Sequence, residues 1–277
     1  MQISKNKKYQ YLFFFILTIY TIFNGGNSNL LIQINFSLLS LLFLFCLKDR
    51  NYRSHLNIFY ERNKFSIIFY FIFLFYLIFQ IIPIPVDFLK FFSLEKYNIL
   101  GKLNFENKYS SISLAPANSF FQFLNFLTLI IFLFIIKMIF YTERHTSRLY
   151  LYLSFLGFVS SLFAILLFLN GNPDFFFFKN KSYFDSSTGF FVNRTVFSIF
   201  LLFCLISSFE LLKKSNLTKQ KKKNVNFFLK IYIRFFIIFI TIGIITSFSR
   251  IGNFLLLITI VFYLLNDFFF VKNNDKP

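Results

Sequence analysis

Eight apolar segments follow one another along the chain, each separated from the next by a polar or charged stretch. They cover approximately residues 9–24, 29–47, 65–85, 119–140, 149–170, 195–212, 231–248 and 251–271. A bilayer core of about 30 Å needs roughly 20 apolar residues in helical form, because a backbone polar group without a hydrogen bond is costly in lipid. We therefore predict an all-α fold: a transmembrane bundle of about eight helices that forms a single domain over residues 1–277.

Three of the expected connections have a pattern of their own. Residues 86–118 mix phenylalanine and leucine with lysine and glutamate, which predicts a short helix at the membrane interface. Residues 171–194 carry the apolar run 175–178 between Asp174 and Lys179, which favours an interfacial dip over a solvated loop. Residues 213–230 are strongly basic and are expected to interact with anionic membrane lipid.

The distribution of charge predicts the orientation. Most of the 29 lysines and arginines lie at the chain ends and in alternate connections, so one side of the expected bundle is strongly basic. Because basic residues near helix ends are retained in the cytoplasm, both termini and residues 213–230 are predicted to be cytoplasmic, and residues 86–118 and 171–194 to be periplasmic. The formal net charge of +18 then reflects topology, and nucleic-acid binding is not expected.

Composition agrees with a membrane protein and adds little chemistry. With 57% hydrophobic residues, 14% charged residues and a mean hydropathy of +0.64, the chain differs from an ordinary soluble domain. The basic start before the first apolar segment resembles a signal peptide, but no small-residue cleavage site follows, so we expect an uncleaved first helix. Cys46 and Cys204 lie within apolar runs, which predicts inert thiols buried in the membrane.

Two arginines lie at the predicted outer face, where the distribution of charge predicts few basic residues. They are the leading candidates for a functional site. Arg194 precedes the sixth apolar segment and Arg250 lies between the seventh and the eighth, so the topology predicts both at one depth of one leaflet. A guanidinium fork suits a tetrahedral oxyanion, and helix N-termini add partial positive charge. We expect a phosphate or pyrophosphate ligand; the alternative is that each arginine only anchors its helix to lipid phosphates.

Small and polar residues accompany both arginines. Asn193 and Thr195 are alternative candidates for the cap of the sixth helix. Gly189, Ser249 and Gly252 are candidates for letting a head group approach the backbone. Asn193 and these last three residues are equally compatible with ordinary turn chemistry.

The motifs around the two arginines resemble those of the bacterial O-antigen ligase and O-antigen polymerase family. The stretch Gly189-Phe190-Phe191-Val192-Asn193-Arg194 and the later stretch Ser249-Arg250-Ile251-Gly252 are similar to two motifs typical of that family. The run SISLAPANSFFQFL is similar to the family's Ser-x-x-Pro entry into a middle helix, and IIPIP at residues 81–85 to its Leu-Pro-Leu-Pro ending of an earlier one. The order and spacing of these motifs extend over most of the chain.

The resemblance implies a glycosyltransferase of the bacterial inner membrane that acts in lipopolysaccharide biosynthesis. Its donor would be a glycan on undecaprenyl pyrophosphate, its acceptor a glycan or the lipid A core, and Arg194 and Arg250 would bind the donor pyrophosphate. A sugar hydroxyl would attack the anomeric carbon, with no metal or other cofactor expected. The catalytic residues are not assigned.

The chain departs from the family pattern in its histidines. Family members carry a candidate catalytic histidine in a large periplasmic loop after the Ser-Arg motif, whereas His55 and His145 fall in expected cytoplasmic loops. Asp174 and Asp185 are candidate bases or ligands on the outer side, or else solvated loop residues. We therefore expect a C-terminally truncated family member, and it stays open whether the chain is an enzyme. The alternatives are a non-catalytic partner in envelope polysaccharide assembly and a subunit of a membrane transporter.

Overall fold

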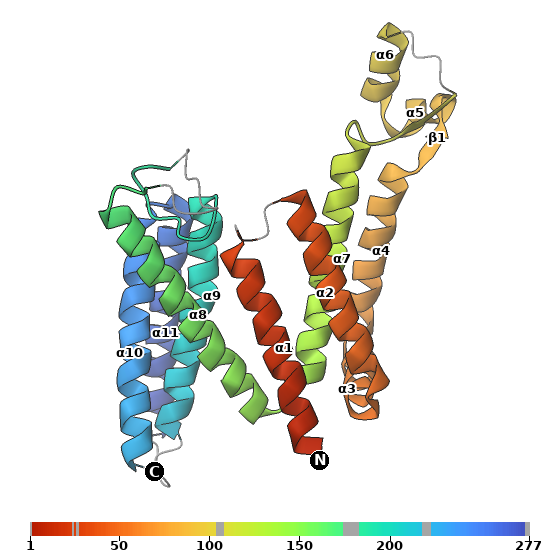
Figure 1. Ribbon diagram of the computed structural model, residues 1–277. Coiled ribbons are helices and arrows are strands. Elements are labelled where there is room, and N and C mark those ends of the chain that lie inside the picture. The colour runs from red at the N-terminus through yellow and green to blue at the C-terminus, as the bar shows by residue number, and fades with distance from the viewer. Residues whose placement is uncertain are drawn as a thin grey trace. The chain divides into compact units, whose positions relative to one another are not determined.

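The computed structural model of the protein describes residues 2–23, 25, 28–103, 108–173, 183–217 and 223–274 (Figure 1). Within these residues the chain forms eleven helices and one two-stranded sheet. It divides into two compact units, Met1–Ile16 with Ser28–Tyr141, and Leu17–Asn27 with Thr142–Pro277. The first helix, α1 (Gln2–Ile22), contributes residues to both units.

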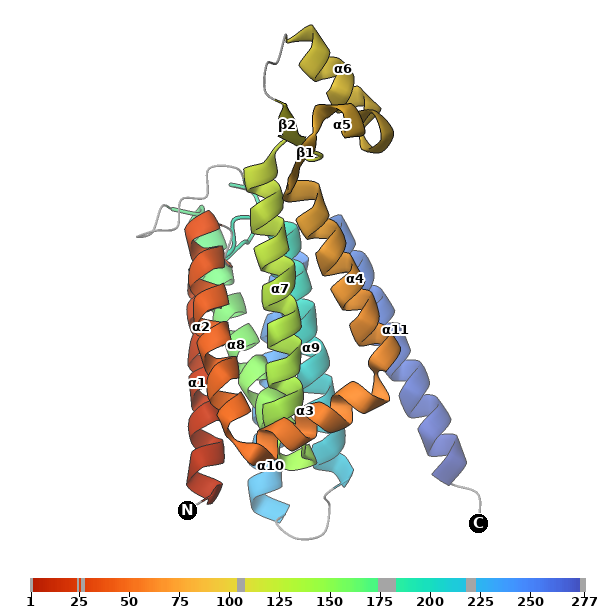
Figure 2. The ribbon, with the colours of Figure 1, turned by 90° about the vertical axis from the view of Figure 1, so that its right-hand side faces the viewer.

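The first unit is built on long helices joined by shorter elements. Its long helices are the early part of α1, α2 (Asn29–Lys48), α4 (Lys64–Ile81) and α7 (Pro116–Ile139). The shorter helix α3 (Arg50–Arg62) leads from α2 to α4 and runs across the end of α7 (Figure 2). At the far end of α4, β1 (Pro83–Pro85) pairs antiparallel with β2 (Tyr109–Ser111), and α5 (Val86–Phe92) and α6 (Leu94–Lys102) lie between these strands in sequence.

Local sequence signals determine where these helices begin and end. The Ser28 hydroxyl accepts a hydrogen bond from the Leu31 amide at 3.3 Å and caps α2. Asp49 ends α2 and caps α3, because its carboxylate accepts an amide of the first turn at 3.1 Å. Pro83, which lacks an N–H group, follows the end of α4, and Pro116 begins α7, where a missing N–H group has no consequence.

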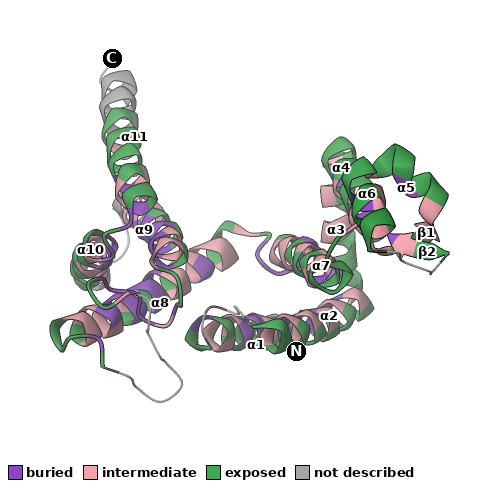
Figure 3. Cartoon of the chain, turned by 90° about the horizontal axis from the view of Figure 1, so that it is seen from above, coloured by how far each residue is buried: buried purple, intermediate pink, exposed green. Residues whose placement is uncertain are grey.

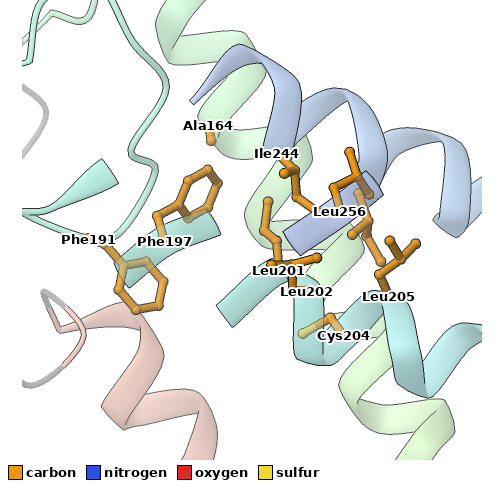
Figure 4. Packing of buried hydrophobic residues seen from close by; sticks show 10 residues of the cluster. Ala164, Phe191, Phe197, Leu201, Leu202, Cys204, Leu205, Ile244 and Leu256 are labelled. Atoms are coloured by element: carbon orange, nitrogen blue, oxygen red, sulfur yellow. The ribbon is translucent and has the colours of Figure 1, made fainter. Parts of the chain in front are cut away.

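The second unit consists mainly of α8 (Glu143–Leu169), α9 (Arg194–Leu217), α10 (Lys223–Thr246) and α11 (Arg250–Asn274). The helices α8, α9 and α10 pack on one another, and α11 packs on α9. Buried positions gather where α8 and α9 face each other (Figure 3), whereas α10 and α11 also carry exposed apolar side chains suited to lipid. The core shown in Figure 4 is formed by Ala164, Phe191, Phe197, Leu201, Leu202, Cys204, Leu205, Ile240, Ile244 and Leu256.

Glycines determine how closely the helices of the second unit approach. A Cβ atom at Gly157 of α8 would lie 2.3 Å from Cys204 Cβ on α9, and one at Gly243 of α10 would lie 2.8 Å from Ser161 Cβ on α8. Gly252 of α11 makes a contact of the same kind with α9. Small residues at such interfaces let membrane helices gain close van der Waals contact, so larger side chains here would force the helices apart.

Helices cover most of each of the eight predicted segments, but the third was predicted to extend to residue 85, whereas α4 ends at Ile81 and Pro83–Pro85 form β1. Six helices of the described chain are long and apolar enough to cross a membrane: α2, α4, α7, α8, α9 and α10. The prediction of a helical multi-pass membrane protein is thereby confirmed. In α11 the apolar stretch is shorter, Arg250–Leu265, and α1 is not among the six. The total of eight spans, the cytoplasmic termini and the single transmembrane domain stay predictions.

The connections differ in detail from the sequence expectations. Residues 86–118 contain two short helices, and their interfacial position stays a prediction. The basic connection at 213–230 is largely helical in its described part, because α9 continues to Leu217 and α10 begins at Lys223. Residues 174–182, including Asp174, Lys179 and the run 175–178, lie outside the described residues. The helix α3 was not predicted, because its dense charges resemble those of a loop.

A buried lysine organises the excursion formed by residues 83–113. Lys96 is 7% exposed, and its ammonium group donates hydrogen bonds to the carbonyl oxygen of Ser111 and, at 2.6 Å, to that of Ser113. The Ser111 hydroxyl lies 3.3 Å from the same nitrogen. Burial lowers the pKa of Lys96, because removal from water disfavours the charged form. The oxygen acceptors compensate for this burial, so Lys96 ties α6 to β2.

Replacing Lys96 by methionine should therefore loosen the excursion. Carbonyl groups left without a donor cost about 1–3 kcal/mol, which corresponds to roughly 5- to 150-fold faster local opening. Hydrogen exchange followed by mass spectrometry should report this increase at the amides of α6 and β2. Lys90→Met removes an exposed lysine of α5 and serves as the control; equal exchange rates in the two variants would contradict the role of Lys96.

The contact at Gly157 leads to a second prediction. Gly157→Ala should destabilise the second unit by about 1–3 kcal/mol, because the new methyl group overlaps Cys204 on α9. The midpoint of thermal unfolding in detergent should fall, and Cys204→Gly in the same chain should restore part of the loss. Gly101→Ala on α6, where a methyl group meets nothing within 4 Å, should leave stability unchanged or raise it. An unchanged midpoint in Gly157→Ala would show that α8 and α9 are not held at this distance.

Candidate functional site

Arg194 and Arg250 each occupy the first position of a helix, and those two helix starts adjoin. Arg194 begins α9 and Arg250 begins α11. The Ser249 hydroxyl donates to the Thr195 hydroxyl at 3.5 Å, so the residues next to the two arginines touch. A Cβ atom at Gly252 would lie 2.3 Å from the Ser198 hydroxyl, which shows how closely the first turns of the helices pack.

Both helix starts are capped by the residue that precedes the arginine. The Asn193 side-chain oxygen accepts a hydrogen bond from the Thr195 amide at 2.8 Å, and the Ser249 hydroxyl accepts one from the Gly252 amide at 3.2 Å. The two N-termini therefore bring the positive ends of two helix dipoles to one end of the second unit. The predicted capping role of Asn193 is confirmed.

An aromatic ring holds one of the two arginines. The Arg194 guanidinium carbon lies 5.3 Å from the centre of the Tyr183 ring, which is a cation–π contact, and the side chain is half-buried. Arg250 is exposed. Tyr183 was not among the predicted site residues, since nothing in its sequence neighbourhood distinguishes it from the chain's other tyrosines.

The segment 183–193 is fastened to the end of the helices by hydrogen bonds. The Asn172 amide group donates to the carbonyl oxygens of Tyr183 at 3.4 Å, Phe184 at 2.5 Å and Ser186 at 3.1 Å. The Ser187 amide donates to a carbonyl oxygen of α10 at 3.0 Å, and its hydroxyl to another at 3.3 Å. These bonds hold the segment in which Tyr183 lies beside Arg194.

Gly189 allows this segment to turn against the helices. Its φ of +56° lies in the left-handed region, and a Cβ atom there would lie 3.0 Å from Ala164 Cβ and 3.2 Å from a ring atom of Phe197. Protein atoms also fill the space beside Gly252. Both glycines therefore serve turn geometry and packing, and their expected role in admitting a head group stays a prediction.

Some buried polar atoms near this end have no hydrogen-bond partner within the described structure. They are the hydroxyl oxygens of Ser160 on α8 and Ser186 on the fastened segment, and the side-chain oxygen of Asn253 in the first turn of α11. Asn253 lies three residues after Arg250, so its oxygen offers an acceptor close to the arginine pair. Sequence inspection alone did not indicate that this oxygen is unpaired.

The other candidate residues are the two histidines and Asp185. His145 is in the first turn of α8 and His55 is within α3, so the expectation that both histidines lie in loops is wrong. His145 is about 36 Å along the helix axis from the end of α8 that precedes the fastened segment. The His55 ring stacks on Tyr141 at 3.6 Å, and partial burial lowers its pKa. Asp185 is exposed on the fastened segment.

The fold defines the class of this protein as a multi-pass helical membrane protein. The chain matches no family model, no curated protein and no solved structure. Assignment to a particular family accordingly depends on the motifs in the sequence and on the arrangement of Arg194 and Arg250, and it is argued below as a proposal.

Asn172→Ala should release the fastened segment. The substitution removes a donor shared by several carbonyl groups, and alanine is disfavoured at the φ of +52° that Asn172 adopts. We expect hydrogen exchange at the Ser187 and Phe191 amides to become roughly tenfold faster or more, in line with the loss of more than one net hydrogen bond. Asn170→Ala at the exposed C-cap of α8 is the matched control. Unaltered exchange in Asn172→Ala would show that other contacts hold the segment.

Proposed function

We propose that the protein is an inner-membrane glycosyltransferase of the O-antigen ligase and polymerase type. It transfers or polymerises glycan from an undecaprenyl-pyrophosphate donor at the periplasmic face. One observation supports this proposal. The first turns of α9 and α11 lie next to each other, and each helix begins with an arginine, Arg194 on α9 and Arg250 on α11.

A diphosphate suits this arrangement for electrostatic reasons. Each guanidinium can form charge-assisted, bidentate hydrogen bonds to a phosphoryl group, and two guanidiniums match the two phosphoryl groups of one diphosphate. The aligned dipoles of α9 and α11 favour the same negative charge. Arg194 is oriented in advance by Tyr183, which lowers the loss of side-chain entropy on binding.

The reaction is a substitution at the anomeric carbon of the donor. An acceptor hydroxyl forms the new bond to that carbon, the bond from the carbon to the diphosphate oxygen breaks, and the electron pair leaves with undecaprenyl pyrophosphate. Arg194 and Arg250 stabilise the charge that grows on the leaving diphosphate. The unpaired oxygen of Asn253 is an acceptor for a hydroxyl of the donor sugar.

The proton of the acceptor hydroxyl requires a base, and the histidines do not fill this role. His145 lies at the opposite end of α8 from the fastened segment, and the ring of His55 is stacked on Tyr141. Asp185 lies on the same segment as Tyr183, and its carboxylate is the candidate base. The variant Asp185→Asn tests this role. Binding of the donor without transfer would instead favour a non-catalytic partner in polysaccharide assembly.

Arg194→Ala and Arg250→Ala test the site directly. Each variant of the full chain in liposomes should bind fluorescent undecaprenyl diphosphate roughly 10- to 150-fold more weakly, as expected for the loss of one charged hydrogen-bonding group. Each should also abolish glycan transfer in a strain that lacks its own ligase or polymerase. Membrane insertion should persist, because neither side chain belongs to the buried core.

The control is Arg144→Ala, which removes an exposed arginine from the first turn of α8. Its binding and transfer should equal those of the unaltered protein. Unchanged donor binding in both Arg194→Ala and Arg250→Ala removes the pyrophosphate role. Movement of a solute across the liposome membrane, lost in the same two variants, would favour the transporter alternative.

A further inference from the structure

One face of α3 packs against other helices of the first unit. Tyr52 is 1% exposed, and its ring meets that of Tyr9 on α1 at 5.6 Å. Two turns further along α3, the Phe59 ring meets the ring of Phe134 on α7 at 6.3 Å. The Lys137 ammonium lies 5.5 Å from the Phe59 ring centre. The helix is therefore fixed to the ends of its neighbours and does not project from them.

The opposite face of α3 is exposed and carries an excess of positive charge. The cations on α3 and at the ends of α2 and α4 next to it, exposed without exception, are Lys48, Arg50, Arg53, Arg62 and Lys64. Only Asp49 and Glu61 oppose them between residues 48 and 64. We call this set of five cations the α3 basic face. A concentration of like charge on a surface requires a counter-charge, and it attracts anions most strongly where they are held in a plane.

The direction of α3 and its apolar flanks suggest which anion is held there. The helix runs across the end of α7 (Figure 2), whereas α2, α4 and α7 are long and apolar enough to cross a membrane. On either side of its polar stripe, Ile58 is 48% exposed and Tyr60 is 50% exposed. A helix with a basic polar face and apolar flanks, lying across the ends of spanning helices, has the character of an interfacial helix.

We propose that the α3 basic face binds the head groups of anionic phospholipids at the membrane surface. Its arginines pair with lipid phosphates through their forked guanidiniums, while Ile58 and Tyr60 enter the adjoining acyl boundary. This site belongs to the first unit and is independent of the arginine pair on α9 and α11. It would hold the first unit at a defined depth in an anionic leaflet.

The chain contains no tryptophan, so Ile58→Trp provides a single fluorescent reporter on α3. The full chain with this reporter is placed in liposomes that contain phosphatidylglycerol and phosphatidylcholine, with one or the other lipid brominated near its head group. Brominated phosphatidylglycerol should quench the fluorescence more strongly than brominated phosphatidylcholine at equal content. Raising the salt concentration from about 0.1 M to 1 M should remove this preference, because the Debye screening length then falls to about 3 Å.

The charge dependence is tested by two matched variants of the reporter chain. Arg50→Gln, Arg53→Gln and Arg62→Gln together should lower the preference for phosphatidylglycerol roughly 100-fold, at about fivefold for each cation. Lys90→Gln, Lys102→Gln and Lys108→Gln together remove the same charge from exposed positions of the excursion and should leave the preference intact.

Two results would overturn the proposal. One is equal quenching by the two lipids in the parent reporter chain at low salt. The other is an emission spectrum typical of water-exposed tryptophan that neither lipid quenches, which would assign the α3 basic face to a soluble partner. The salt series needs no charge substitution, so it decides the question even where the arginine variant fails to fold.

Discussion

The close approach of helices at glycine positions is the constraint on which the second unit depends. In lipid, apolar side chains gain little by exchanging lipid neighbours for protein neighbours, so helices associate where their backbones come close enough for dense van der Waals contact. Gly157 brings α8 onto α9, Gly243 brings α10 onto α8, and Gly252 brings α11 onto α9. Every long helix of this unit thus meets another through at least one residue without a side chain.

The geometry of the candidate site follows from this packing. The contact at Gly252 sets the start of α11 against the start of α9, which is why Ser249 reaches Thr195. The segment 183–193 is fastened in turn to α10 through Ser187, and it carries the Tyr183 ring to Arg194. A change that separates the helices would alter the arginine pair without touching either guanidinium.

The sequence predicted the long helices because a run of apolar residues of membrane length has few alternatives. It also indicated Arg194, Arg250 and the cap Asn193, since charge bias and capping are local signals. It did not indicate α3, where the inward positions are apolar at helical spacing but alternate with strong charges that resemble a loop. Tyr183 and Asn172 were also missed, because their contacts depend on how a connection folds back, and such long-range contacts leave no local pattern.

The position of the two arginines within their helices strengthens the case for an anionic ligand. A cation in the last turn of a helix is stabilised by the dipole, as for Lys48 in α2 and Arg62 in α3. Arg194 and Arg250 instead occupy first turns, where the dipole disfavours a cation by about 0.3–1 kcal/mol, and the two adjoining N-termini add to each other's effect. Helix stability therefore does not explain these arginines. A diphosphate bound as proposed would reverse the sign of the interaction for both helices at once, because its charge would neutralise the guanidiniums and complement the dipoles.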